Sequence, residues 1–148
     1  MFNKILSKII SKIKKEPYKV DEAITLGVML GIVMDKGFMV LRGIYHKILL
    51  KQSKGILFIG KKVKIRNHRK IKFMGSATIE DNCSINALSK GGITVQGNFS
   101  LGRNSIIECT GVIRELGEEL VIGENVGIAA NAFIAVRGKV EIGDNTII

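Results

Sequence analysis

From Phe73 to Ile148, apolar residues recur at intervals of six within successive stretches of the chain, with polar residues between them. Each group of six opens with Phe, Ile, Val or Leu and has a small or β-branched residue at its fifth place, except at Phe99. This period fits a short strand followed by a turn, with the opening residue pointing inward and the fifth residue at a bend. The opening residues are Phe73, Ile79, Ile85, Val95, Leu101, Ile107, Ile122, Ile128, Ile134 and Ile142.

The groups of six are arranged in threes. Triplets begin at Phe73, Val95, Ile122 and Ile142, so their starts are 22, 27 and 20 residues apart. The residues beyond eighteen always follow the third group, as expected for coils that bulge at one corner without disturbing the core. The pattern predicts an all-β solenoid, a parallel β-helix of three-sided coils stacked about 4.8 Å apart. A β-sandwich with Gly-rich turns is the alternative, although it does not require this period.

The N-terminal residues 1–15 have a different period. Their apolar residues follow helical spacing, while lysines and serines occupy the other positions. This pattern predicts a basic amphipathic helix of the kind that lies in a membrane interface. A tail that packs on its own domain is the alternative. The apolar residues are Phe2, Ile5, Leu6, Ile9, Ile10 and Ile13.

Residues 16–55 are predicted to form an apolar helical hairpin that associates with a membrane or with partner subunits. Residues 23–34 are predominantly apolar and uninterrupted by charge, but twelve helical residues span only about 18 Å of a hydrocarbon core about 30 Å thick. Asp35 and Lys36 then separate them from a second helical segment, 38–50. The β-helix is predicted over residues 56–148, and its first turn, rich in Lys and Arg, is expected to cap the stack.

The charge is concentrated in one half of the chain. Residues 1–72 contain 18 Lys and Arg against 4 Asp and Glu, a net charge of +14, whereas residues 73–148 contain 5 against 9, a net charge of −4. The basic half therefore indicates an anionic partner. An anionic membrane surface is favoured over nucleic acid, because no stacking aromatics are interleaved with the cations. Cys83 and Cys109 have no metal-site spacing and are expected to be buried free thiols.

The repeat resembles the hexapeptide-repeat acyltransferases, most clearly in ITVQGNFSLGRNSII and IGENVGIAANAFI. The resemblance covers residues 73–148 well and points to bacterial enzymes that O-acetylate sugars of capsular or exported polysaccharides. It implies a left-handed β-helix, a homotrimer, acetyl-CoA as co-substrate without a metal, and a sugar or polysaccharide precursor as acceptor. With the basic N-terminal half, it implies a cytoplasmic enzyme that is peripheral at the inner face of the membrane.

The resemblance also implies a catalytic histidine on a later coil, acting as general base on the sugar hydroxyl. The two histidines, His46 and His68, do not lie on that frame, so no catalytic residue is assigned. We expect the base beyond Ile148, an incomplete C-terminal end of the β-helix, and no activity from these 148 residues.

Three polar residues are candidates for binding the acceptor: Arg114, Asn131 and Arg137. Arg114 lies in an insertion after the third group of its triplet, and the other two lie on a later coil. They could equally be ordinary loop and corner residues. Two other functions stay open, a non-catalytic β-helical scaffold at a membrane and, less favoured, a nucleic-acid binder.

Overall fold

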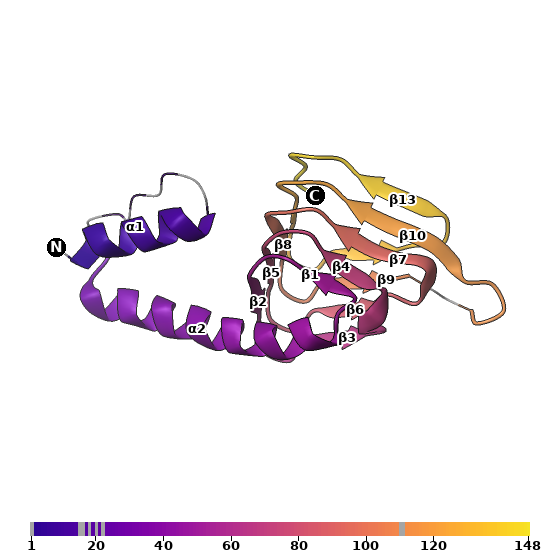
Figure 1. Cartoon of the computed structure of the whole chain (residues 1–148), viewed down its shortest axis with the longest axis horizontal. Helices are drawn as coiled ribbons and strands as arrows, with labels where there is room; N and C mark the ends of the chain where they lie inside the picture. Colours follow the sequence, from indigo (N-terminus) through magenta and orange to yellow (C-terminus); the bar gives the residue numbers. More distant parts are fainter. Residues whose placement is uncertain (1, 15–16, 18, 20, 22, 110–111) are drawn as a thin grey trace. The chain divides into compact units, whose positions relative to one another are not determined.

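The computed structural model describes the chain except residues 1, 15–16, 18, 20, 22 and 110–111. The ends of the predicted helix 1–15 and the fifth-place residue Gly111 therefore lie outside the described residues. The chain forms two compact units, Met1–Lys36 and Gly37–Ile148. The helices α1 (Phe2–Lys14) and α2 (Leu26–Leu49) precede the strands (Figure 1).

The predicted N-terminal helix is confirmed as α1, but the predicted hairpin is wrong. Helix α2 continues for 24 residues through Asp35 and Lys36. Both side chains are exposed, so their charges stay in water and give the helix no reason to end. Gly37 weakens a helix by only about 1 kcal/mol, and no proline follows. Within the described residues, neither helix combines the length and the apolar character needed to cross a membrane.

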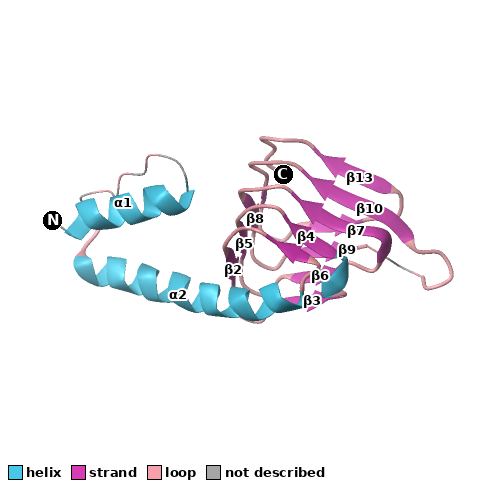
Figure 2. Cartoon of the chain, viewed as in Figure 1, coloured by secondary structure: helices cyan, strands magenta, loops and turns pink. Residues whose placement is uncertain are grey.

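Among the described residues, thirteen short strands follow α2 and form three sheets in which every pairing is parallel (Figure 2). The first sheet contains β1 (Gln52–Ser53), β4 (Ile71–Phe73), β7 (Ser89–Val95), β10 (Gly117–Ile122) and β13 (Lys139–Ile142). The second contains β2 (Leu57–Ile59), β5 (Ala77–Ile79), β8 (Phe99–Leu101) and β11 (Gly127–Ile128). The third contains β3 (Lys64–Arg66), β6 (Ser84–Asn86), β9 (Ile106–Glu108) and β12 (Phe133–Ala135).

The strand order shows how the chain moves among the sheets. Neighbours within a sheet are three strands apart in sequence, so the chain visits the three sheets in rotation. We call three consecutive strands a coil. This topology is consistent with a parallel β-helix. Pairing begins at β1, so Gln52 and Ser53 belong to the sheets and not to the predicted hairpin segment. The 3₁₀ turn η1 (His68–Lys70) joins the first coil to the second.

The opening residues of the sixes form the core, as predicted. Parallel registers align them in three columns, one for each sheet. Most are almost fully buried, and Ile134 and Ile142 near the chain end are partly buried. The columns are Phe73–Val95–Ile122–Ile142, Ile59–Ile79–Leu101–Ile128 and Ile65–Ile85–Ile107–Ile134.

Several fifth residues of the sixes are also buried in the core, which the sequence pattern left unstated. Phe99, the exception to the small-residue rule, is 3 % exposed and belongs to the same core cluster as the opening residues. The sixes that have one of these buried fifth residues therefore contribute two side chains to the interior. The other buried fifth residues are Ala77, Cys83, Ser89, Ser105 and Val126.

Asparagines stack at two corners of the coils. Each has φ between 50° and 61°, a left-handed conformation that asparagine tolerates better than most residues. Their side-chain amides form hydrogen bonds from one coil to the next. Asn82 donates from Nδ2 to Oδ1 of Asn104 at 3.3 Å, and Asn104 donates from Nδ2 to Oδ1 of Asn131 at 3.1 Å. The second ladder joins Asn98, Asn125 and Asn145.

The second half of α2 packs against the first coil within the Gly37–Ile148 unit. At Gly43 the helix backbone meets the backbone of β2. A Cβ atom at residue 43 would overlap the carbonyl oxygen of Leu57 and lie 2.8 Å from its carbonyl carbon. One residue earlier, Arg42 donates from Nη1 to the carbonyl oxygen of Ile59 at 3.0 Å. Glycine is required here because any side chain would push the helix off the strand.

Candidate functional site

Arg114 lies on the excursion between β9 and β10. An antiparallel bridge joins Val112 to Glu115, so this excursion turns back on itself before the chain re-enters the first sheet. Arg114 is exposed, and the neighbouring Ile113 has 89 % of its surface in contact with solvent. The predicted loop is therefore present and presents Arg114 to solvent.

The structure places Arg137 at the same corner as Arg114 and Asn131 at a different one. Arg137 follows β12, where the chain again passes from the third sheet to the first, and its carbonyl oxygen accepts a bond from the amide of Glu118 at 3.0 Å. Asn131 lies between β11 and β12, where its side chain is the acceptor for Asn104. The side chain of Asn131 is therefore hydrogen-bonded to the neighbouring coil. Binding of the acceptor sugar by Arg114, Asn131 and Arg137 stays a prediction.

The two histidines, which the sequence left without a role, meet in the structure. Nδ1 of His46 on α2 lies 3.0 Å from Nε2 of His68 in η1, and the rings stack with centroids 5.2 Å apart and planes at 16°. Tyr45 packs its ring edge-on against His46 at 5.3 Å. A hydrogen bond between imidazole nitrogens needs one protonated and one bare nitrogen, so the pair holds at least one neutral ring.

Both histidines favour the neutral form. Burial lowers the pKa of His46, and the charge that His68 can carry lowers it further. Burial also lowers the pKa of His68. A neutral imidazole is a proton acceptor at neutral pH, so this pair has the chemistry of a base although it lies outside the frame of the later coils.

His46 also borders a hollow of about 380 Å³ between α2 and the first coil. Its wall combines aliphatic side chains with the cations Arg42 and Lys62. Such a wall suits an anionic group attached to an apolar body. The lining residues are Leu41, Arg42, Tyr45, His46, Ile59, Gly60, Lys62 and Val63.

Sequence reasoning missed this site because its parts are weak signals when taken singly. His46 and His68 are 22 residues apart on elements of different type. They meet because the chain after α2 makes one coil and returns: the amide of Lys51 bonds to the carbonyl oxygens of His68 and Ile71 at 3.3 and 3.1 Å. The proximity of the two histidines therefore depends on how the first coil closes, which the sequence pattern does not show.

The cysteines are buried free thiols, as predicted. Burial raises the pKa of both, to about 11 for Cys109. A thiol with a raised pKa is a poor nucleophile, so neither is a candidate for catalysis. In the part of the chain that the structure describes, no three His, Cys, Asp or Glu side chains gather as metal ligands would.

Comparisons with family models, with curated proteins and with solved structures found no match to this chain. The resemblance to hexapeptide-repeat acyltransferases therefore rests on the residues of the repeat themselves.

Proposed function

We propose that this chain belongs to a membrane-associated O-acetyltransferase that moves an acetyl group from acetyl-CoA to a sugar hydroxyl. The observation that carries the proposal is the set of three columns of opening residues. Within a coil the opening residues follow one another at intervals of six, and the opening residues of neighbouring coils pair in parallel. That arrangement is what the resemblance to the hexapeptide-repeat acyltransferases leads one to expect.

Several finer features of the proposal come from the resemblance alone. The β-helix is proposed to be left-handed, opposite to the hand usual for crossovers between parallel strands. The active form is proposed to be a homotrimer, and the acceptor a sugar of a polysaccharide precursor. Arg114 and Arg137, which share a corner, are the proposed acceptor contacts, and Asn131 is proposed to act from the neighbouring corner.

No histidine on the later coils is available to act as the general base that the proposal requires. Both histidines precede β4, and residues 73–148 contain none. Acyl transfer to a hydroxyl needs a base within hydrogen-bond reach of that hydroxyl. We therefore expect residues 1–148 alone to lack transferase activity, and a histidine on this frame to come from further hexapeptide coils.

Membrane association is proposed from the N-terminal half. Helix α1 exposes Ile5 and Ile9, each to about half of its surface (52 and 50 %), beside the exposed Lys4 and Lys8. This composition suits a helix lying in an anionic interface. The proposed site of action is the cytoplasmic face of the membrane, where precursors of exported polysaccharides are built.

The test is acetyl transfer from radiolabelled acetyl-CoA to sugar acceptors by the protein that the complete gene encodes. Residues 1–148 serve as the matched control and are expected to transfer nothing. Substituting both Arg114 and Arg137 with alanine is expected to raise the KM for the sugar more than the KM for acetyl-CoA. A complete protein that assembles at membranes but neither binds nor turns over acetyl-CoA would instead support the non-catalytic scaffold.

A further inference from the structure

Residues 37–72 contain eleven Lys and Arg residues and no acidic residue. The three ion pairs found among the described residues join Arg103 to Glu80 and Lys139 to Glu119 and Glu141. All of these groups lie on later coils. The cations of the 37–72 segment are therefore left without a carboxylate partner from the described residues, and their combined field favours an anionic surface.

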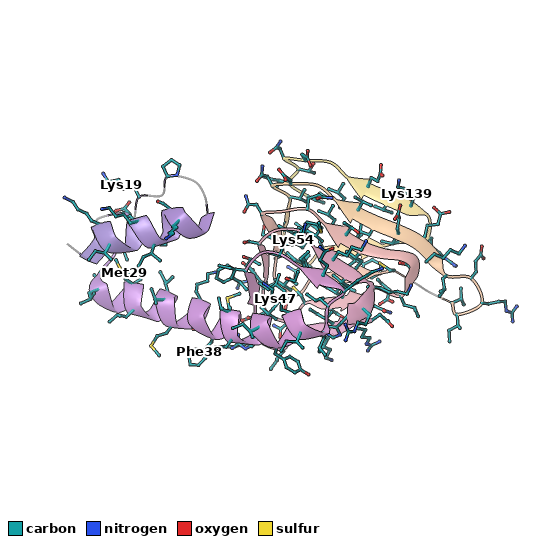
Figure 3. All side chains as sticks on the ribbon, viewed as in Figure 1. Lys19, Met29, Phe38, Lys47, Lys54 and Lys139 are labelled. Atoms are coloured by element: carbon teal, nitrogen blue, oxygen red, sulfur yellow. The ribbon has the colours of Figure 1, made fainter. Side chains whose placement is uncertain are left out.

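An exposed apolar stripe runs along the same segment. Phe38, Leu41, Tyr45 and Ile48 are 52, 62, 64 and 73 % exposed. Their spacing of three, four and three positions puts them on one face of α2. Figure 3 shows Phe38 projecting from the helix on the side away from the sheets. Four large exposed apolar residues in one line indicate a surface that contacts something apolar.

The stripe and the cations meet at the hollow beside His46. Leu41 and Tyr45 of the stripe form part of its wall, and Arg42 and Lys62 form another part. Arg42 uses one N–H on the carbonyl oxygen of Ile59, so the guanidinium retains further donors. Apolar contact and phosphate-binding donors thus lie within one small area.

We infer that this face, the α2 stripe with the hollow beside it, docks onto an anionic phospholipid bilayer, the hollow receiving a headgroup phosphate. This inference rests on the proposed membrane association. It adds to α1 a second membrane-binding surface, which lies on the Gly37–Ile148 unit. Stripe side chains enter the headgroup boundary, while the cations meet lipid phosphates.

Two other occupants fit less well. Nucleic acid would use the cations, but it offers no hydrocarbon layer for Leu41 and Ile48. A second copy in a two-fold contact would bring the same cations against each other, because both partners present the same patch. A bilayer of anionic lipid satisfies the apolar stripe and the charge together.

The experiment is vesicle flotation of the whole chain with phosphatidylglycerol and with phosphatidylcholine vesicles at fixed salt. Leu41→Glu/Ile48→Glu places two carboxylates on the stripe. Its control, Ile113→Glu/Phe133→Glu, makes the same change at residues 89 and 66 % exposed on the later coils. Lys62→Gln tests the hollow against Lys90→Gln on β7. Helix α1 is intact in every variant, so its contribution cancels.

The inference expects binding to phosphatidylglycerol only. Leu41→Glu/Ile48→Glu should weaken it about tenfold or more, and Lys62→Gln about fivefold, the effect of one cation near a charged surface. Both controls should stay within about twofold. Equal losses in the stripe variant and its control would overturn the inference. So would an RNA affinity, or self-association of the chain in sedimentation without lipid, that the stripe variant abolishes. No readout uses acetyl-CoA, so a failure here leaves the transferase assay standing.

Discussion

Gly43→Ala is the sharpest test of how α2 meets the first coil. The new Cβ would overlap the carbonyl oxygen of Leu57 and lie 3.1 Å from the Leu57 Cβ. A backbone carbonyl in a parallel sheet cannot swing aside as a flexible side chain can. The helix must therefore move away from β2, or the strand must bend.

The size of the effect follows from opposing contributions. Replacing a helical glycine with alanine favours the helix by about 1 kcal/mol. Overpacking costs about 1–3 kcal/mol. A shifted helix also loses the bonds from Arg42 to Ile59 and from His46 to His68, about 1 kcal/mol each. We expect a net loss of about 2–4 kcal/mol in the free energy of unfolding.

Gly37→Ala is the matched control, since it makes the same change in the same helix. A Cβ at residue 37 meets nothing within 4 Å, so only the gain in helix propensity remains. That gain is about 0.5–1 kcal/mol. The two variants should thus differ by about 3–5 kcal/mol with opposite signs, or about 6–20 °C in Tm for a chain of this size.

Thermal and urea unfolding followed by circular dichroism at pH 7.5 would measure both variants. The imidazole ¹H and ¹⁵N resonances report separately whether His46 still bonds to His68. If Gly43→Ala stabilised the protein as much as Gly37→Ala and left those resonances in place, the backbone contact between α2 and β2 would be refuted.

Three further predictions concern pH, the corners and the core. Because both histidine pKa values are lowered on folding, the contribution of the histidines to the free energy of unfolding should be constant above pH 7 and fall as pH drops below about 6.5; in His46→Gln/His68→Gln, urea titrations between pH 5.5 and 7.5 should lose most of this slope. Asn104→Ala should cost about 1–2 kcal/mol and Asn104→Gly less, because glycine adopts φ 58° freely; equal costs in urea unfolding would assign the loss to the amide ladder alone. Leu101→Ala, at a fully buried position, should cost about 2–5 kcal/mol, against less than about 0.5 kcal/mol for Ile113→Ala; similar melting temperatures would contradict the inward column.

The sequence determined the coils because their rule is local. Residues such as Ile79 and Leu101 fill the interior of the coils and must therefore be apolar. Because such residues recur at intervals of six, the pattern can be recognised in the sequence alone. The three alignments of the opening residues then follow from the lengths of the triplets. The helix 1–15 was predicted on the same ground, a short period of apolar residues within one element.

Other features were decided by contacts between distant parts of the chain. Asp35 and Lys36 look like a helix boundary in the sequence, yet α2 continues because both side chains face water. The position of Asn131 in the sequence made it a candidate for binding the acceptor sugar. The structure shows that its side-chain oxygen accepts a hydrogen bond from Asn104, one coil away. Neither fact has a local signature.

The amino-acid pattern alone thus determined the repeat, the two charge-separated halves and the buried thiols, since each follows from which residues can tolerate water. The tertiary structure alone decided that Gly43 touches Leu57, that His46 bonds to His68 and that Arg114 shares a corner with Arg137. Those pairings depend on where the first coil closes on α2 and how the corners align. A one-dimensional pattern holds no information on such distances.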